Sequence, residues 1–413
     1  MTGAVAGGRT GATGGAPAGG VPAIDAAAVL ARRPAWVEVD HEAVAANVRA
    51  LADLVAPAAL CAVVKADGYG HGAVAVARTA LASGATWLAV AMAGEGAALR
   101  AAGIDAPVLV LGEPTAEEWD DVVRLGLRPT VHRSEAVAGL GAAARRAGGA
   151  ALPVHLKVDT GMHRIGVAPD RAAALAAEVD AHPWLVLEGV WTHCPVADEP
   201  GNPYTAAQAE RFATVVAALR SSGVAPPLVH AANSAAAMDH PALRGDLARS
   251  GIAVYGLDPS PALAGRLPLR PALSLKATVT STRVVPAGEA VSYGLRRPCV
   301  VDTVVATVPL GYADGVPRRL GELGGEVLVR GRRRPFAGTV TMDQVLVDCG
   351  PPGEAHVAVG DEVVLLGRQG GLRIGAEEWA ARLGTISYEI TCGISARVPR
   401  RHVGARWPAE APG

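Results

Sequence analysis

The sequence predicts an α/β fold in which a region of alternating strands and helices precedes a mostly-β domain. Two observations support this prediction. Between residues 60 and 256, short apolar runs alternate with Ala-, Leu- and Arg-rich segments that are apolar at helical spacing. After about residue 265, prolines and short valine-rich runs replace those helical segments, which is typical of short strands separated by turns. A length of 413 residues suits two domains.

The first region contains eight strand-like runs. The segments between them, such as residues 94–103 and 134–148, have helical spacing and end in Arg followed by Gly. Eight strands with intervening helices fit a (β/α)8 barrel of the TIM type, although a doubly wound sheet would show the same alternation. An earlier run at residues 36–40 precedes a helix and is a candidate for pairing outside the barrel. The eight runs are residues 60–66, 87–92, 108–112, 128–131, 154–159, 187–193, 228–234 and 252–256.

The second region is expected to be mostly β, with one helix at residues 375–383. A run of arginines at residues 330–334 lies in a predicted β-hairpin of a chain with a net charge of -1. We expect it to be a solvated turn rather than a nucleic-acid site. The expected strands are residues 277–280, 300–308, 327–329, 345–348 and 362–366.

The N-terminus is rich in glycine and alanine and lacks the continuous apolar stretch of a signal peptide. Residues 1–31 are therefore expected to form a disordered tail. The barrel is expected over residues 32–265 and the β domain over residues 266–413.

Composition excludes several classes of function. The net charge of -1 gives no electrostatic reason to bind nucleic acid or an anionic membrane. The sequence contains no apolar run of the roughly 20 residues that a membrane span needs. Five cysteines, widely spaced and without a C-x-x-C pair, suit free thiols in a reducing compartment. We expect a cytoplasmic protein without a metal site.

Lysine is the scarcest charged residue of the chain. Only three lysines, Lys65, Lys157 and Lys276, stand among the 38 basic residues, and the rest are arginines. A primary amine can lose its proton and form a Schiff base, whereas a guanidinium cannot. Because Lys65 ends an apolar run and is followed by glycines and a tyrosine, a pyridoxal phosphate (PLP) enzyme is the first hypothesis to test.

Polar residues recur where the predicted barrel strands end. Lys65, Lys157, His193 and the pair Asn233–Ser234 occupy such positions, and catalytic groups of these barrels lie at the carboxyl ends of the strands. Neighbouring glycines such as Gly251 would let backbone N–H groups approach a phosphate. Taken singly, each residue has an ordinary structural explanation, such as a solvated lysine or a hydrogen-bonded histidine. Their agreement on one rim indicates a site.

Seven motifs in order resemble those of bacterial alanine racemases, and the resemblance covers about residues 34–403. It implies a PLP enzyme with an N-terminal barrel and a C-terminal β domain. The motifs are AVVKADGYGHG at 62–72, HLKVDTGMHR at 155–164, RSGIAVYG at 249–256, VSYG at 291–294, GYADG at 311–315, MDQ at 342–344 and ISYE at 386–389.

The resemblance assigns roles to individual residues. Lys65 would hold PLP and act as the base on the D-alanine face, and Tyr293 would serve the opposite face. A tyrosine with an ordinary pKa near 10 is a poor base at neutral pH, so the residues matching His193 and Arg249 would tune it. Cofactor binding is implied for Lys65, Tyr69, His193, Asn233, Ser234, Arg249, Gly251, Ile252 and Tyr388, and substrate binding for Arg164, Met342, Tyr312 and Asp343.

Two further expectations follow from the resemblance. Lys157 matches a lysine that is carbamylated in many members, where its charge orients the arginine at Arg164. Tyr293 would come from a second subunit, so the active sites would exist only in a homodimer. The implied function is the interconversion of L- and D-alanine, which supplies D-alanine for peptidoglycan.

Some positions depart from the family pattern, and rival functions stay open. Cys194 follows His193 where an aromatic residue is frequent, and Thr341 precedes Met342 where cysteine is frequent. Both lie near the implied site and bear on substrate breadth. One rival is a racemase of serine or another small amino acid. A PLP decarboxylase is disfavoured by Arg249 and Tyr293, and a non-catalytic PLP carrier could consist of the barrel alone.

Overall fold

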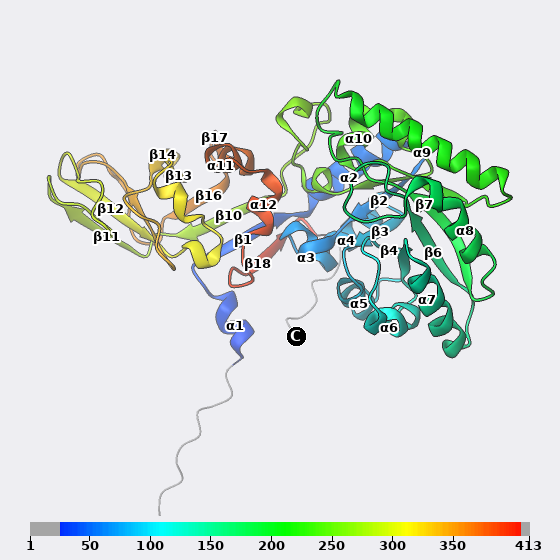
Figure 1. The fold of residues 1–413 in the computed structure, drawn as a ribbon. Coiled ribbons are helices and arrows are strands. Elements are labelled where there is room, and N and C mark those ends of the chain that lie inside the picture. Colours follow the sequence, from blue (N-terminus) through cyan, green and yellow to red (C-terminus); the bar gives the residue numbers. More distant parts are fainter. Residues whose placement is uncertain (1–24, 406–413) are drawn as a thin grey trace, which may run out of the picture.

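The structure is a computed structural model that describes residues 25–405. It has two parts, a parallel barrel and a mostly-β domain that extends from one side of it (Figure 1). The site predicted from the sequence depends on the barrel, whose strands determine where the polar residues lie.

Eight parallel strands form a nearly closed barrel, as the sequence predicted. Their order around the sheet is β8-β7-β6-β5-β4-β3-β2-β9, so each strand from β2 to β8 lies beside the next one and β9 pairs with β2. The strands are β2 (Ala59–Val63), β3 (Trp87–Val90), β4 (Val108–Val110), β5 (Arg128–Val131), β6 (Leu152–Lys157), β7 (Leu185–Trp191), β8 (Leu228–His230) and β9 (Leu247–Ser250).

Helices cover the outside of the barrel (Figure 1). In α7 (Ser134–Ala147) the buried residues Val137, Leu140 and Ala144 recur at helical spacing, and the helix ends at Gly148, whose φ is +66°. The other barrel helices are α2 (His41–Val55), α4 (Ala73–Ala82), α5 (Ala93–Ala101), α6 (Trp119–Arg124), α8 (Ala172–Asp180), α9 (Pro203–Ser221) and α10 (Ser234–Asp239). The short segment α3 (Lys65–Tyr69) follows β2 and contains three residues with non-helical backbone angles.

The predicted position of the eighth strand is wrong. That strand is β9 at Leu247–Ser250, whereas Ile252–Tyr255 forms a short 3-10 helix, η4. The sequence pattern fails here because Arg249 and Ser250 are polar residues buried inside the barrel. The apolar residues of η4, in contrast, pack in the core without belonging to a strand.

The second part consists of two sheets. The larger has the order β14-β13-β16-β10-β1-β18, with β17 beside β16, and the smaller has the order β11-β12-β15. The strands are β1 (Ala35–Asp40), β10 (Leu273–Thr278), β11 (Ser281–Val285), β12 (Thr303–Val308), β13 (Glu326–Val329), β14 (Arg332–Pro335), β15 (Val345–Asp348), β16 (Glu362–Gln369), β17 (Leu372–Ile374) and β18 (Arg400–Val403). Two helices, α11 (Ala376–Leu383) and α12 (Ser387–Cys392), complete it.

The early strand pairs outside the barrel, as expected. β1 pairs antiparallel with β10 and parallel with β18. The chain therefore forms a strand of the larger sheet before it builds the barrel. In that sheet β1, near the start of the described chain, lies beside β18, near its end.

The N-terminal prediction needs a correction. Residues 1–24 lie outside the described residues, but Ala26–Ala31 forms a helix, α1. Alanine has the highest helix propensity, and the Asp25 carboxylate accepts a hydrogen bond of 3.1 Å from the Ala28 N–H at the start of this helix.

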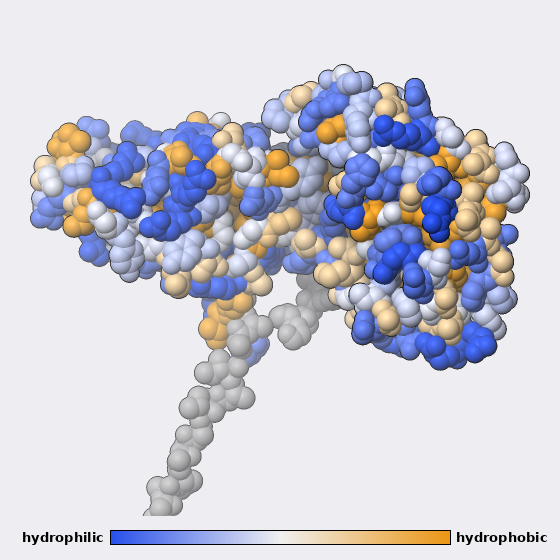
Figure 2. All heavy atoms as spheres, viewed as in Figure 1, coloured by the Kyte–Doolittle hydropathy of each residue, from blue (hydrophilic) through white to orange (hydrophobic). Residues whose placement is uncertain are grey.

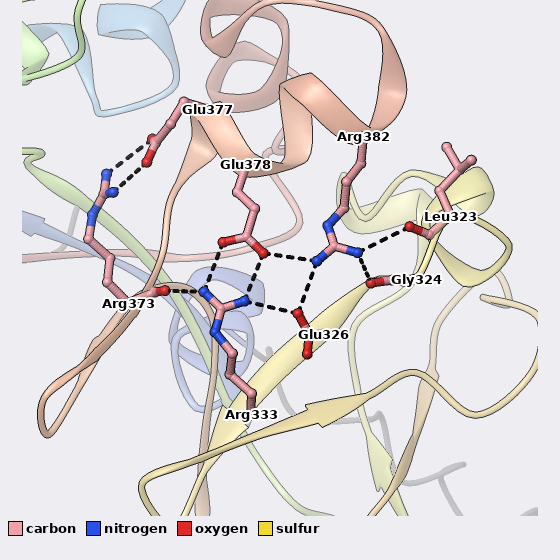
Figure 3. Close-up of polar contacts among 8 residues, drawn as sticks. All are labelled: Leu323, Gly324, Glu326, Arg333, Arg373, Glu377, Glu378 and Arg382. Atoms are coloured by element: carbon pink, nitrogen blue, oxygen red, sulfur yellow. Dashed lines mark hydrogen bonds and ion pairs between the residues drawn. The ribbon is translucent and has the colours of Figure 1, made fainter. Parts of the chain in front are cut away.

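The arginine run is also more than a solvated turn. Arg333 of β14 contacts the carboxylates of Glu326 and Glu378 at 2.9 and 2.8 Å, and Arg382 contacts the same two carboxylates at 3.0 and 3.1 Å. Figure 3 shows this network joining β13, β14 and α11. It fastens the hairpin to the helix.

Hydrophobic and hydrophilic residues are mixed over the face seen in Figure 2. Several exposed apolar side chains belong to β11 and to the segment that leads into β12, among them Val284, Leu295 and Val300. Within the described chain, no helix is both long and apolar enough to cross a membrane.

Candidate active site

A cavity of about 670 Å³ opens where the barrel strands end. Residues that lie far apart in the sequence meet there, from β2 at one side to α12 of the second part. Ten of the predicted residues line it, namely Lys65, Tyr69, Arg164, His193, Asn233, Ser234, Arg249, Gly251, Ile252 and Tyr388.

Lys65 lies in an unusual turn directly after β2. The three residues that follow it, Ala66, Asp67 and Gly68, have φ values of +52°, +50° and +61°. L-residues rarely adopt this left-handed conformation, which costs roughly 1–2 kcal/mol per residue. The Glu95 carboxylate accepts a hydrogen bond of 2.6 Å from the Ala66 N–H and holds the turn. Such strain is typical of functional positions.

The environment of Lys65 favours its neutral amine. Burial and the charge of Arg164 lower the pKa of Lys65, while the Glu95 carboxylate opposes them. A lysine must lose its proton before it can attack a carbonyl group. The position therefore suits a lysine that forms a Schiff base.

One end of the cavity presents neutral hydrogen-bond donors. The Ser234 hydroxyl accepts a hydrogen bond of 2.9 Å from the Gly251 N–H, while burial raises the pKa values of Tyr69 and Tyr388 and keeps both phenols protonated. A Cβ at position 251 would lie 2.3 Å from the Tyr69 hydroxyl. Only glycine leaves room here, and hydroxyl and backbone donors around such an opening fit a phosphate group.

Asn233 stabilises the backbone at this end of the cavity through two side-chain hydrogen bonds. Its side-chain oxygen caps α10 by accepting a hydrogen bond of 2.9 Å from the Ala236 N–H. Its amide nitrogen donates to the Cys194 carbonyl at 3.1 Å. Asn233 thus ties the end of β8 to the segment after β7.

Arg249 lies at the bottom of the cavity and is 3% exposed. Its Nη2 donates to the carbonyls of Thr192 and Ala231 at 2.8 and 3.1 Å and lies 3.4 Å from His193 Nδ1. Burial lowers the pKa of Arg249 to about 10, so it stays charged at neutral pH. Burial and the Arg249 charge hold the pKa of His193 well below its usual value, which leaves that histidine neutral.

Lys157 is buried close to Arg249. Its Nζ lies 4.5 Å from the centre of the Trp191 ring, and Arg249 lies over that ring at 4.6 Å. Burial, with the charges of Arg164 and Arg249, lowers the pKa of Lys157 to about 7. A large fraction of Lys157 is therefore a neutral amine at physiological pH.

Arg164 is held over the cavity by a tight loop after β6. Asp159 accepts hydrogen bonds of 3.0 Å from the N–H groups of Gly161 and His163. Gly166 closes the loop, where a Cβ would lie 2.7 Å from the Asp159 nitrogen. This geometry, together with the bridge between Val158 and Val167, directs the loop back to the barrel.

Apart from Lys157, which is buried against Trp191, four predicted residues do not line this cavity. Tyr293, Tyr312, Met342 and Asp343 lie in the second part of the chain. The Tyr293 carbonyl accepts a hydrogen bond of 2.9 Å from the Thr339 hydroxyl, and the Tyr312 N–H donates to the Thr341 carbonyl at 3.0 Å. The four residues thus share one loop cluster, and Tyr293 is 74% exposed.

Two supporting residues escaped the sequence analysis. Trp191 packs against both Lys157 and Arg249, and Glu95 holds the turn after Lys65. Trp191 lies near the end of a predicted strand, as the polar rim residues do. Glu95 gave no comparable signal, because a glutamate near the start of a helix is common.

Known proteins similar to this chain share both of its parts. Family models described as "Alanine racemase, N-terminal domain" and "Alanine racemase, C-terminal domain" match residues 39–259 and 272–402. The alanine racemase of Symbiobacterium thermophilum is 50% identical over 372 residues, which are 90% of this chain and 98% of that protein.

Solved structures agree. The alanine racemase of Streptomyces coelicolor is 41% identical, with a TM-score of 0.86 over 92% of this chain and all of that one. A histidine racemase from Leuconostoc mesenteroides is 29% identical, with a TM-score of 0.82 over 90% of this chain and 98% of that one.

Proposed function

This chain belongs to the alanine racemase family, and we propose that it works through Lys65 and Tyr293 as two bases on opposite faces of a PLP-bound substrate. It interconverts L-alanine and D-alanine, and in this family the reaction supplies D-alanine for peptidoglycan. The single observation that carries the residue assignment is the cavity in which Lys65, Arg249 and the Ser234–Gly251 pair meet.

The residues present fit PLP. Lys65 would hold its aldehyde carbon, and Tyr69, Ser234, Tyr388 and the backbone at Gly251 and Ile252 would hold its phosphate. When bound, PLP withdraws electron density from the α-carbon of the substrate and lowers the cost of removing its proton. The donor set and the opening at Gly251 support this assignment.

Lys65 would move the proton on the D-alanine face. Its amine would be free once substrate has replaced it, and burial with the charge of Arg164 lowers the pKa of Lys65 below its usual value. Such a group can accept a proton and later return one, which a positioned base must do within hydrogen-bond reach of the α-carbon.

Tyr293 would move the proton on the opposite face. Its high exposure supports the inference that it enters the cavity of a second copy of the chain. There His193 would assist it. Since His193 is neutral and its Nδ1 faces Arg249, its Nε2 carries the hydrogen and can donate to the Tyr293 oxygen.

The substrate carboxylate would be bound by Arg164 and by the Met342 N–H of the second copy. We infer that Lys157 reacts with carbon dioxide to form a carbamate, whose negative charge orients Arg164. A pKa of about 7 supports this, because only the neutral amine reacts. Tyr312 and Asp343 would narrow the entrance and favour a methyl-sized side chain.

Arg249 would determine the type of reaction. It would face the ring nitrogen of bound PLP, and because a guanidinium does not give up its proton at neutral pH, it would leave that nitrogen unprotonated. With its nitrogen unprotonated, the ring would withdraw less electron density. Side reactions that need a stronger electron sink, such as transamination, are thereby limited.

A second candidate is a racemase with a broader substrate range. The histidine racemase of similar fold shows that this architecture accommodates another amino acid in that protein. In this chain the departures at Cys194 and Thr341 lie beside His193 and Met342. A PLP carrier without turnover fits less well, because both family models match, including that of the C-terminal domain.

We infer a cytoplasmic homodimer. The five cysteines are free thiols, which suits a reducing compartment. The loop cluster that holds Tyr293 and Tyr312 has exposed side chains available to a second copy.

Purified protein loaded with PLP tests the proposal. Chiral chromatography should detect D-alanine formed from L-alanine, with slower conversion of L-serine measured in parallel. Borohydride reduction followed by peptide mapping should find the cofactor on Lys65. A label on Lys157 or Lys276 instead would overturn the assignment, and faster conversion of serine would favour the second candidate.

A further inference from the structure

Beneath the cavity, a line of buried polar side chains runs away from Arg249 through the barrel. Arg249 Nη1 lies 2.8 Å from His230 Nδ1, and His230 Nε2 lies 2.9 Å from His155 Nδ1. His155 Nε2 lies 3.1 Å from the Glu188 carboxylate. Both histidines are fully buried. Arg249, His230, His155 and Glu188 come from β9, β8, β6 and β7 in that order. His230, His155 and Glu188 do not belong to the catalytic set described above.

The backbone is built to admit this line. The pairing of β6 with β7 passes from Val154–Leu187 to His155–Gly189, which leaves Glu188 as the extra residue of a β-bulge. Bulges commonly redirect a side chain near an active site. At Gly189, a Cβ would lie 2.4 Å from His155 Nδ1, so glycine is needed for the imidazole to fit.

Each end of the line has a fixed hydrogen-bonding role. Arginine can only donate, and an ionised carboxylate can only accept. Although burial raises the pKa of Glu188, the hydrogen bond from His155 and the charge of Arg128 lower it below its usual value. Arg128 donates from Nε to the same Glu188 oxygen at 3.2 Å.

The two histidines are neutral. Burial lowers the pKa of His155, and burial with the Arg249 charge holds the pKa of His230 well below its usual value. A neutral imidazole has one donor and one acceptor nitrogen. Only one arrangement then satisfies both ends: Arg249 donates to His230 Nδ1, His230 Nε2–H donates to His155 Nδ1, and His155 Nε2–H donates to Glu188.

We propose that Glu188 is a positioning residue for racemisation, because it fixes the tautomers of His155 and His230 and thereby the orientation of Arg249. This inference rests on the proposed role of Arg249 opposite the PLP ring nitrogen. Among the described residues, the partners of the Arg249 guanidinium are two backbone carbonyls and the imidazoles of His193 and His230, with no carboxylate. Glu188 is the carboxylate that reaches it, through two rings.

Without an acceptor at position 188, the hydrogen bonds between His155 and His230 can reverse their direction. If His155 carries its hydrogen on Nδ1, it directs a donor at His230 Nε2, and His230 must then carry its own hydrogen on Nδ1. That hydrogen would face the Arg249 donor. Two donors opposed in a buried site exclude the hydrogen bond, and Arg249 would turn from its present position.

The test compares Glu188→Leu with Glu188→Gln. Leucine removes the acceptor, whereas the glutamine oxygen can still accept from both Arg128 and His155. Glu38→Leu is the matched control, since Glu38 pairs with Lys276 at 2.9 Å in the other domain. Each protein is labelled with ¹⁵N-histidine, and signals are assigned with His155→Asn and His230→Asn variants.

In the cofactor-free protein at neutral pH, the imidazole nitrogen shifts should show both histidines protonated at Nε2. Glu188→Leu should mix the tautomers, whereas Glu188→Gln and Glu38→Leu should keep them. In the PLP-loaded enzyme, kcat per bound PLP should fall about 10–100-fold in Glu188→Leu, the range found for partners that orient metal-bound histidines. The KM for alanine should stay the same, since its carboxylate binds elsewhere.

Three results would overturn the proposal: unchanged tautomers in Glu188→Leu, unchanged kcat per bound PLP, or equal damage in Glu188→Gln. A merely structural role would lower the unfolding temperature and PLP content while leaving kcat per bound PLP intact. If the wild-type enzyme fails to racemise alanine, the proposed function fails, but the nitrogen shifts still decide whether Glu188 fixes the tautomers.

Discussion

At the scale of single residues, the candidate site gathers several basic side chains around one cavity. Burial lowers the pKa values of Lys65, Lys157 and Arg249, and the charges of neighbouring cations lower those of the two lysines further. The scarcity of lysine identified the first two from the sequence. The sequence could not show that Arg249 lies in a strand or that Trp191 packs against both Arg249 and Lys157, because these contacts join distant segments.

Replacement of Tyr293 by phenylalanine should separate the two bases. The variant lacks only a phenolic oxygen, so the fold and the spectrum of bound PLP should stay as in the wild type. Racemisation in both directions should fall by about 10²–10⁴, the usual contribution of a positioned acid or base. Solvent deuterium should still enter the α-position of D-alanine slowly but hardly that of L-alanine. Equal exchange from both enantiomers would indicate a single mobile base.

Carbamate formation on Lys157 should depend on pH. With a pKa of about 7, Lys157 is mostly neutral at pH 8 and mostly protonated at pH 6. Protein incubated with ¹³C-bicarbonate should therefore give a carbamate carbon signal at pH 8 that fades below pH 7. The signal should be absent from Lys157→Arg and present in Lys276→Arg. A signal that persists in Lys157→Arg would assign the carbamate to another amine.

At the scale of elements, polar residues inside strands caused the main error. The apolar pattern located seven barrel strands near their true positions but moved the eighth to the apolar η4. Within the second part, the pattern placed β15 at its observed bounds. It did not identify α12, which is only six residues long. Short elements depend on packing partners more than on their own periodicity.

The network of Figure 3 should stabilise the attachment of α11 to the β13–β14 hairpin. Glu378→Gln should lower the free energy of unfolding by about 1 kcal/mol, the upper range for partly exposed ion pairs. Asp121→Asn is the control, because its pair with Arg124 is exposed and isolated. Denaturant titrations of both variants at low salt check this. If both variants lost the same free energy of unfolding, the network would contribute no more than a single exposed ion pair.

The same contribution should vanish in acid. The hydrogen bond from Arg333 lowers the pKa of Glu378. The stabilisation is therefore present above the unfolded-state pKa of about 4.3 and is lost as pH falls through the lower folded-state value. The stability difference between wild type and Glu378→Gln should shrink below about pH 4.

At the scale of the whole molecule, the proposed site residues lie in two separate places on one chain. Lys65 lies in the cavity at the mouth of the barrel, while Tyr293 is exposed in the second part. β11 and β12, which flank the Tyr293 segment in the sequence, lie at the end of the molecule away from the barrel (Figure 1). The proposed homodimer would join the Lys65 region of one chain to the Tyr293 region of the other.

Mixing two inactive variants tests that arrangement. In a dimer of Lys65→Ala and Tyr293→Phe chains, one site carries both changes and the other carries neither. Activity should therefore return to roughly a quarter of the wild-type level when equal amounts exchange freely at random, since about half of the dimers are mixed. Exchange is verified with differently tagged chains. Absent recovery despite exchange would show that each chain completes its own site.

The sequence by itself determined the family and the two-part α/β architecture, and it supplied the candidate residues for the proposed chemistry. These properties are local: a lysine beside glycines, strand-end polar residues and apolar periodicity can each be recognised within a short segment. The tertiary structure decided which of these residues meet. It brought the Gly251 N–H to the Ser234 hydroxyl, buried Lys157 beside Arg249, and lined up Glu188, His155 and His230 behind that arginine. The physical reason is that burial and hydrogen-bond direction, which fix protonation, depend on neighbours from distant strands.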